Sequence, residues 1–316
     1  MGRARMRFRR LGHNIKGLIA RVPKRYVISL GKLLGDILFL ADVHDRRLVL
    51  RNLRFIHTDF SQDQIRHMSR RIFQHLGITF LETCQIATLS REDVLAKVGT
   101  LGEEHFLRAL RENKGVIAIA AHLGNWEMAL QFASCHFKWP VTTVVRKAPF
   151  ARLDRWLTHF RTRFGARVIR KEDALRDMMK VLRRGEILNL MVDQGRASDG
   201  ADVTFFGRKA TATRGAALVA IRCGSPVVMA SCVRAPDGEL ILRFYPPLNI
   251  QRTGDLRTDV QVNTQTISDA VEKAIREHPE QWCWNQRKWK KHHPELYPEF
   301  FAGKERKKRR FARNDD

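Results

Sequence analysis

Residues 115–131 read GVIAIAAHLGNWEMALQ, and this stretch decides the fold that we expect for the rest of the chain. From Val116 to Ala121 it is a continuous apolar run with β-branched residues, which is typical of a strand buried on both faces of a sheet. Gly124 then permits an unusual backbone conformation, and Asn125 can cap a helix that begins at Trp126. The pattern predicts a strand, an elbow and a helix.

The elbow carries a histidine, and a glutamate follows it five residues later. On one continuous helix His122 and Glu127 would point about 140° apart, so they cannot share a helix face. If the helix starts near Asn125, His122 can fold back toward Glu127 in the first turn, and an imidazole held by a carboxylate can deprotonate a hydroxyl. A packing histidine beside a glutamate that complements the helix dipole explains the same spacing. Both interpretations stay open from spacing alone.

Beyond the elbow, strand patterns alternate with helix patterns. We expect strands at 116–121, 141–146, 166–170, 187–192, 226–233 and 239–245, and helices at 125–137, 150–164, 173–184, 212–222 and 264–277. Residues 44–112 read as mostly helical. This predicts an α/β domain with a largely parallel central sheet flanked by helices. The expected division is a basic leader and membrane-anchoring helix in 1–43, one α/β domain in 44–298, and a basic, disordered tail in 299–316.

The segment from Asp193 to Arg214 reads as a long, glycine-containing loop, which we expect to be functional. Asp193 and His122 both follow buried strands, and ligands bind at the carboxyl ends of strands in open α/β sheets. For Asp193 the alternative is a turn or capping role. Phe205 and Phe206 in the same loop can serve by packing alone.

One arginine is selected by helical geometry. Between residues 150 and 164, apolar residues recur along a stripe that we expect to be buried: Phe150, Leu153, Leu157, Phe160 and Phe164. Arg161 falls beside that stripe, whereas Arg163 lies about a quarter turn from its centre. A buried-side arginine needs an anionic partner, which Glu127, Asp193 or a substrate phosphate could supply. A structural salt bridge is equally compatible.

The charge of the chain predicts an anionic partner. There are 58 Lys and Arg against 33 Asp and Glu, a net charge of +25. Nucleic acid, anionic lipid and an acidic carrier protein all qualify. Five scattered cysteines without a CxxC pair predict reduced thiols in a cytosolic compartment. Trp282, Trp284 and Trp289, set among basic residues, suit a membrane interface or stacked nucleobases.

The N-terminal segment combines bases with an apolar stretch. Nine basic residues and no acidic one precede Val27, and the apolar run to Val43 is interrupted by Lys32 and Asp36. These charges favour an interfacial helix over a membrane-spanning one or a cleaved signal peptide. An ordinary core-packing helix behind a solvated leader is the alternative.

Several blocks, in order, resemble the lipid A biosynthesis (late) acyltransferase family. The stretch from His122 to Glu127 is similar to its His-x4-Glu box, and four further matching blocks are Glu103-Glu-His-Phe, Asp193-Gln, residues 205–213 and residues 278–282. The likeness covers roughly residues 26–298. The chain departs from the family at Gln286, where a histidine is usual, and at Val145-Arg-Lys147, where the family has Tyr-Arg-Pro.

This resemblance implies an O-acyltransferase at the cytoplasmic face of the inner membrane. It would move a fatty acyl group from acyl carrier protein to a hydroxyl of a lipid A precursor or a related phosphorylated glycolipid, with anionic membrane lipid as a further partner and no metal or cofactor. His122 would be the base, Glu127 would orient it, and the substrate would be bound by Arg161, Asp193, Asn125, Arg163 and Gln194. The alternative, a basic nucleic-acid-binding protein without enzymatic activity, lacks a recognisable binding signature.

Overall fold

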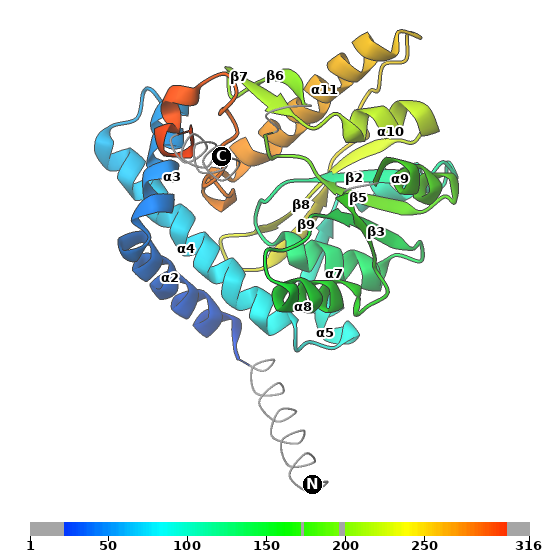
Figure 1. Cartoon of the computed structure of the whole chain (residues 1–316). Coiled ribbons are helices and arrows are strands. Elements are labelled where there is room, and N and C mark those ends of the chain that lie inside the picture. Colours follow the sequence, from blue (N-terminus) through cyan, green and yellow to red (C-terminus); the bar gives the residue numbers. More distant parts are fainter. Residues whose placement is uncertain (1–21, 172–173, 196–199, 302–316) are drawn as a thin grey trace, which may run out of the picture.

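The structure, a computed structural model, describes residues 22–171, 174–195 and 200–301 (Figure 1). Most of the basic leader and the whole basic run from residue 304 to 313 lie outside these described residues, so the roles expected for them stay predictions.

A seven-stranded sheet forms the centre of the described part, in the order β1-β9-β8-β2-β5-β3-β4. The strands are β1 Val98–Leu101, β2 Val116–Ala120, β3 Val141–Val145, β4 Arg167–Arg170, β5 Ile187–Met191, β8 Val227–Arg234 and β9 Leu240–Phe244. Every neighbouring pair is parallel except β8 and β9, which are antiparallel. The predicted α/β class with a largely parallel sheet is confirmed.

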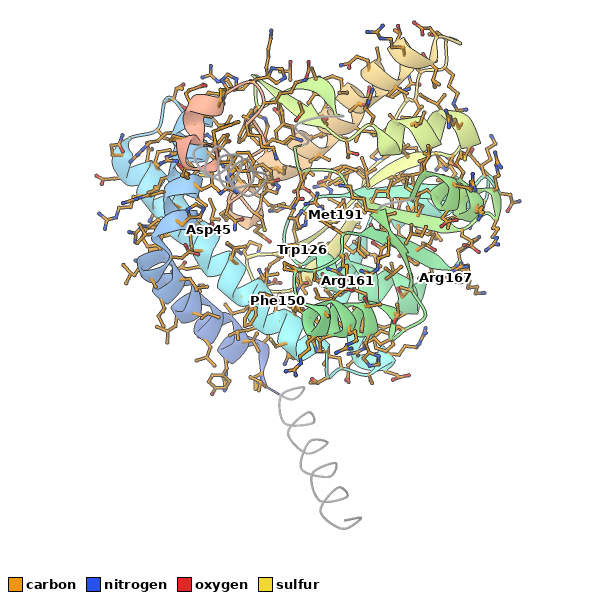
Figure 2. All side chains as sticks on the ribbon, in the orientation of Figure 1. Asp45, Trp126, Phe150, Arg161, Arg167 and Met191 are labelled. Carbon is orange, nitrogen blue, oxygen red and sulfur yellow. The ribbon has the colours of Figure 1, made fainter. Side chains whose placement is uncertain are left out.

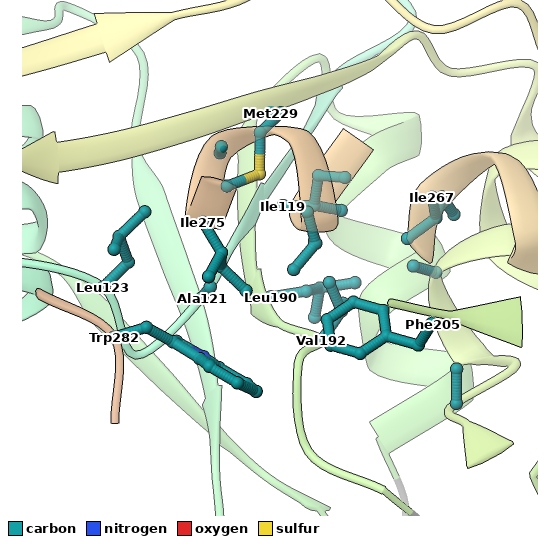
Figure 3. Packing of buried hydrophobic residues seen from close by; sticks show 14 of the residues in the cluster. Ile119, Ala121, Leu123, Leu190, Val192, Phe205, Met229, Ile267, Ile275 and Trp282 are labelled. Carbon is teal, nitrogen blue, oxygen red and sulfur yellow. The ribbon is translucent and has the colours of Figure 1, made fainter. Parts of the chain in front are cut away.

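Helices cover both faces of the sheet (Figure 1). They are α2 Lys24–Ala41, α3 Val43–Ile56, α4 Gln62–Ile86, α5 Arg91–Ala96, α6 Glu103–Leu110, α7 Trp126–His136, α8 Ala151–Thr162, α9 Ala174–Arg183, α10 Gly215–Cys223 and α11 Leu256–Glu277. Along β2, Ile117 and Ile119 join the core under α9, α10 and α11, whereas Val116 and Ala118 join the core under α6 and α7. This alternation follows from the two-residue period of a strand. Figure 3 shows the first of these cores, with Ile119 and Leu190 packed beside Phe205.

The expected loop from Asp193 to Arg214 contains an antiparallel hairpin, β6 Ala201–Phe205 and β7 Arg208–Ala212. The turn between the strands places Phe206 at φ 53° and Gly207 at φ 70°. Phe205 and Phe206 are buried, so their role in this structure is packing. The prediction missed the hairpin because exposed polar residues such as Asp202, Thr204 and Lys209 interrupt its strands, which therefore lack the continuous apolar run of β2.

The tryptophan-rich stretch was predicted wrongly. Trp282, Trp284 and Trp289 are 1%, 0% and 0% exposed, and they pack around Phe205 and Phe206. They therefore belong to the core of the protein and do not offer a surface to a membrane or to nucleobases.

The helix α2 packs along α4 through a face of small residues. A Cβ atom on Gly31 would lie 2.5 Å from the Ile78 Cα, and one on Gly35 would lie 2.4 Å from the Gln74 Cα, so side chains there would separate the helices. Asp36 binds Arg70 at 2.7 and 2.8 Å. The opposite face of α2 exposes five aliphatic side chains: Leu30, Leu33, Ile37, Leu38 and Leu40. Within the described residues, no helix is long and apolar enough to cross a membrane.

The apolar stripe of α8 is buried only in its second half, which corrects our prediction. Phe160 is 2% exposed, whereas Phe150 and Leu153 are 72% and 42% exposed. Amphipathic spacing identifies the apolar face of a helix, but it does not reveal how much of that face the rest of the chain covers.

Candidate active site

The elbow between β2 and α7 forms as the sequence predicts. Gly124 adopts φ 62°, and a Cβ atom there would lie 2.0 Å from the Cys232 carbonyl oxygen, so a side chain has no room. The Gly124 N–H donates to the Gln281 carbonyl at 3.0 Å, and the Asn125 N–H donates to the Cys232 carbonyl at 2.7 Å. The Asn125 side chain caps α7 by accepting from the Met128 N–H at 2.9 Å. These bonds hold in place the backbone of Gly124 and Asn125, which follow His122 in the chain.

His122 meets Asp193 because their strands are neighbours in register. Ala120 pairs with Met191 in the parallel β2 and β5, so the residues two positions later stand side by side. The His122 Nδ1 lies 2.9 Å from the Asp193 Oδ1, and the His122 backbone N–H donates to Oδ2 at 3.0 Å. With the carboxylate on Nδ1, that nitrogen carries the ring proton and Nε2 is left to act on a substrate.

The carboxylate that holds the imidazole is therefore Asp193, which corrects the expectation that Glu127 does so. Asp193 is 1% exposed and also accepts from the Trp282 Nε1 at 2.9 Å and the Gln286 Nε2 at 3.2 Å. Burial raises the pKa of Asp193, but the charge of His122 and these donors outweigh it and hold the pKa well below its ordinary value. The acid stays ionised beside the imidazole.

The same pairing acts on the histidine. Burial alone lowers the pKa of His122, yet the charge and hydrogen bond of Asp193, followed by the charge of Glu127, raise it above its ordinary value. The imidazole is thus a stronger base than in water, because its protonated form has a buried anion beside it.

Glu127 binds Arg161 instead. The Arg161 Nε lies 3.2 and 3.1 Å from the two Glu127 carboxylate oxygens, and its Nη2 also donates to Oε1. Burial lowers the pKa of Arg161, but Glu127 raises it more, so the guanidinium keeps its charge. Arg163 points elsewhere and donates to the carbonyls of Ile86 and Leu89. The predicted helical phase is thereby confirmed, although the role of Arg161 in substrate binding stays a prediction.

A large open cavity, about 2580 Å³ in volume, lies in front of this pair. His122, Glu127, Arg161 and Gln194 line it, and in Figure 2 Trp126 and Arg161 lie near each other at this site. Seven Lys or Arg and three Asp or Glu stand among its described lining residues. The wall is therefore cationic and suits an anionic ligand.

Three of the residues expected to bind substrate do not line the cavity. Asp193 lies behind His122, and Arg163, which follows the last residue of α8, donates to backbone carbonyls at and just after the end of α4. Asn125 is fully buried, and its amide donates to Glu82 at 2.8 Å. Direct contact with a substrate is thus available to Arg161 and Gln194, whereas the other three contact only neighbouring protein groups.

Two groups of residues were missed at the sequence level. Glu82 forms a buried ion pair with Arg234, whose Nε lies 3.0 Å from Oε1, and this pair supports Asn125 at the elbow. Lys288 lies buried over the Phe205 ring, where burial lowers its pKa to about 8 against the opposing charge of Asp193. For Glu82 and Arg234 the available signal was a charged residue beside an apolar stretch, because each needs a partner once buried. Lys288 stands among other basic residues and gave no such signal.

The fold and site define an α/β protein that holds a histidine–aspartate pair at the strand ends of its sheet, beside a cationic cavity. Residues 7–291 match the bacterial lipid A biosynthesis acyltransferases, and the chain belongs to this family. The resemblance noted in the sequence is thereby confirmed, and nothing in the comparisons supports a nucleic-acid-binding protein.

The chain is also similar to individual acyltransferases of lipid A biosynthesis and of phosphatidylinositol mannoside. The chain is 25% identical over 289 residues to the lipid A biosynthesis lauroyltransferase of Escherichia coli K12, covering 89% of this chain and 90% of that protein. It is 22% identical over 270 residues to the lipid A biosynthesis acyltransferase of Haemophilus influenzae, covering 84% and 82%. It is 28% identical over 202 residues to the phosphatidylinositol mannoside acyltransferase of Mycolicibacterium smegmatis, covering 60% and 64%.

Proposed function

We propose that this acyltransferase moves a fatty acyl group from the thioester of acyl carrier protein to a hydroxyl of a lipid A precursor or a related phosphorylated glycolipid, at the cytoplasmic face of the inner membrane. The observation that carries the proposal is the His122 imidazole, bound through Nδ1 by the buried Asp193 and presented at the wall of a cationic cavity. Such a base is what a hydroxyl nucleophile requires.

The reaction follows from this geometry. The His122 Nε2 takes the proton of the acceptor hydroxyl as its oxygen attacks the thioester carbonyl, and the resulting imidazolium is stabilised by Asp193. The tetrahedral intermediate then expels the carrier thiolate, which recovers the proton from the imidazolium. An ester forms and a thioester breaks, so no redox step is needed. Arg161, held by Glu127, places a cation on the cavity wall, where it can bind a phosphate or stabilise the oxyanion.

The charge distribution supports the choice of partners. The excess of basic residues around the cavity suits a phosphorylated acceptor, and the net charge of +25 suits an acidic carrier protein and anionic lipid. The names of the relatives denote acceptors that are glycolipids of two kinds, lipid A and phosphatidylinositol mannoside. Gln286, placed where the family usually has a histidine, touches Asp193, so this departure lies behind the catalytic pair.

The outer face of α2 supports placement at a membrane. Its five side chains form an exposed apolar surface in the part of the chain that the structure describes, on a helix whose other face is fixed to α4. A helix of this kind suits the interface plane of a bilayer.

Mass spectrometry tests the proposal directly. Full-length protein is incubated with acyl carrier protein bearing acyl chains of several lengths and with either a lipid A precursor or a phosphatidylinositol mannoside. We expect a mass gain of one acyl group on one acceptor, and no gain with His122→Ala. If neither glycolipid gains mass with any carrier-bound chain, the assignment of donor and acceptor is wrong.

A further inference from the structure

The first two turns of α8 present large apolar side chains to solvent. Phe150, Leu153 and Trp156 are 72%, 42% and 45% exposed, and they span an arc of about 120° on the helix. Trp156 stacks on the buried Phe160 with ring centroids 5.5 Å apart, so its ring is held in place while nearly half of it remains exposed. We name these three side chains the α8 apolar patch.

Positive charge surrounds the α8 apolar patch. Arg146, Lys147, Arg152 and Arg155 are all exposed. The acid in this stretch, Asp154, is already engaged by Arg170 at 2.9 and 2.8 Å. A surface of aromatic and aliphatic side chains ringed by cations is complementary to a layer of apolar chains beneath anionic headgroups.

The patch lies at the mouth of the candidate active site. Leu157, one turn after Leu153 on the same helix, lines the cavity, and Arg161 lines it one turn further on. The C-terminal end of α8 also contacts the helix pair α2 and α4. Arg163 donates to the Ile86 carbonyl at the end of α4, along which α2 runs. In Figure 1, α2 and α8 flank α4, and Figure 2 labels Phe150 at the start of α8.

We propose that the α8 apolar patch is a second membrane-contacting surface, which inserts into the interface of a bilayer that contains anionic lipid. An acidic protein would satisfy the cations, but it would leave the highly exposed Phe150 ring and the separate apolar face of α2 without a common partner. A bilayer contacts both surfaces at once. The contact would hold the mouth of the cavity against the membrane that supplies the acceptor. In this respect the inference rests on the proposed function.

The tryptophan in the patch makes the contact measurable. Full-length protein is mixed with vesicles of phosphatidylethanolamine and phosphatidylglycerol that carry brominated acyl chains, which quench nearby indole fluorescence. The signal of Trp156 is isolated by subtracting that of Trp156→Phe. We expect strong quenching and a blue shift with anionic vesicles, and at least tenfold weaker vesicle binding for Phe150→Ser combined with Leu153→Ser. The matched control is Leu101→Ser, an apolar side chain 54% exposed on β1 at the opposite end of the sheet order, which should bind as the wild type does.

The outcomes separate this inference from the proposed function. Transfer to a detergent-dispersed acceptor should be unchanged in the double variant, because neither residue lines the cavity. If the Trp156 signal is not quenched, or the double variant binds vesicles as the wild type does, the membrane assignment is overturned. A raised KM for acyl carrier protein with unchanged vesicle binding would make the patch a carrier docking site instead. Quenching by a wild-type protein that transfers no acyl group would leave the patch assigned and overturn only the proposed reaction.

Discussion

Two carboxylates raise the pKa of His122, and they differ in depth and in partner. Asp193 is 1% exposed and accepts four hydrogen bonds, two of them from His122, without reaching the cavity. Glu127 is 6% exposed, lines the cavity and binds Arg161. The acid nearer in sequence acts on the imidazole through its charge, whereas the acid 71 residues away fixes its tautomer. We therefore expect the deeper acid to orient the base and the shallower pair to contact the substrate.

The largest effect is expected at the residue between the two acids. His122→Ala removes the base and should lower kcat/KM by on the order of a hundred- to ten-thousand-fold. The protein should still fold, because His122 is partly exposed on the cavity wall. Radiolabelled acyl transfer measures the rate, and thermal melting checks the fold. A folded His122→Ala protein with activity within a few fold of the wild type would show that neither acid serves a histidine base.

The next largest effect separates the two acids. Asp193→Asn keeps the shape but loses the charge that selects the Nδ1–H tautomer, so transfer should fall by on the order of a hundredfold or more. Glu127→Gln leaves the His122–Asp193 bond intact and should cost less. Steady-state rates of both folded variants check this order. A larger loss for Glu127→Gln would reverse the assignment and restore the role that we first predicted for Glu127.

The same variants should move the pH dependence of transfer. A base acts in its neutral form, so kcat/KM should rise with pH through the His122 pKa, which lies above its ordinary value of 6.5. In Asp193→Asn the effect of burial on the His122 pKa is no longer opposed by the Asp193 charge, so that pKa should fall. The acid limb of the kcat/KM profile should therefore shift to lower pH. Glu127→Gln should shift it in the same direction by a smaller amount. A limb that stays in place in both variants would mean that His122 is not the titrating group.

A smaller effect tests the shallow pair. Arg161→Lys keeps a positive charge but cannot bind both Glu127 oxygens in the same planar geometry. A charge-assisted hydrogen bond contributes about 1.5–3 kcal/mol, so we expect a loss on the order of ten- to a hundred-fold. The control is Arg163→Lys, which alters contacts with two carbonyls outside the cavity and should change thermal stability more than rate. Equal rate losses would remove the distinction between the two arginines.

The sequence predicted what depends on local periodicity. The strand before His122, the cap at Asn125 and the phase of Arg161 all follow from the spacing of neighbouring residues, and the structure shows each of them. Both His122 and Asp193 were placed at strand ends, where a site is expected in such sheets.

The sequence did not predict what depends on strand order. That β5 lies beside β2 is a non-local pairing, with β3 and β4 intervening in the chain, so Glu127 was preferred to Asp193 as the nearer acid. The tryptophans near the C-terminus were misplaced for the same reason, because nothing local shows that the β6–β7 hairpin covers them. The exposed start of α8 adds the converse case, in which an apolar stripe was taken to be covered and is not.

The smallest expected effect concerns the donors that hold Asp193 in place. Trp282→Phe removes the Nε1–H that donates to Asp193 and should lower transfer by only a small part of what Asp193→Asn does, because the His122 N–H and Gln286 still bind the same oxygen. Loss of a hydrogen bond to a charged group should also cost about 1.5–3 kcal/mol of stability, in addition to the volume lost.

Trp284→Phe is the matched control for this change. Trp284 is equally buried and also loses one hydrogen bond, but its Nε1 donates to the Pro279 carbonyl at 2.7 Å and not to Asp193. Both variants should therefore melt at lower temperature, Trp282→Phe by more because its lost bond is to a charged group, while Trp282→Phe alone lowers kcat and leaves the KM for acceptor unchanged. If the two variants transfer acyl groups equally well, the indole at Trp282 contributes packing alone, and orientation of Asp193 rests on its bonds with His122 and Gln286.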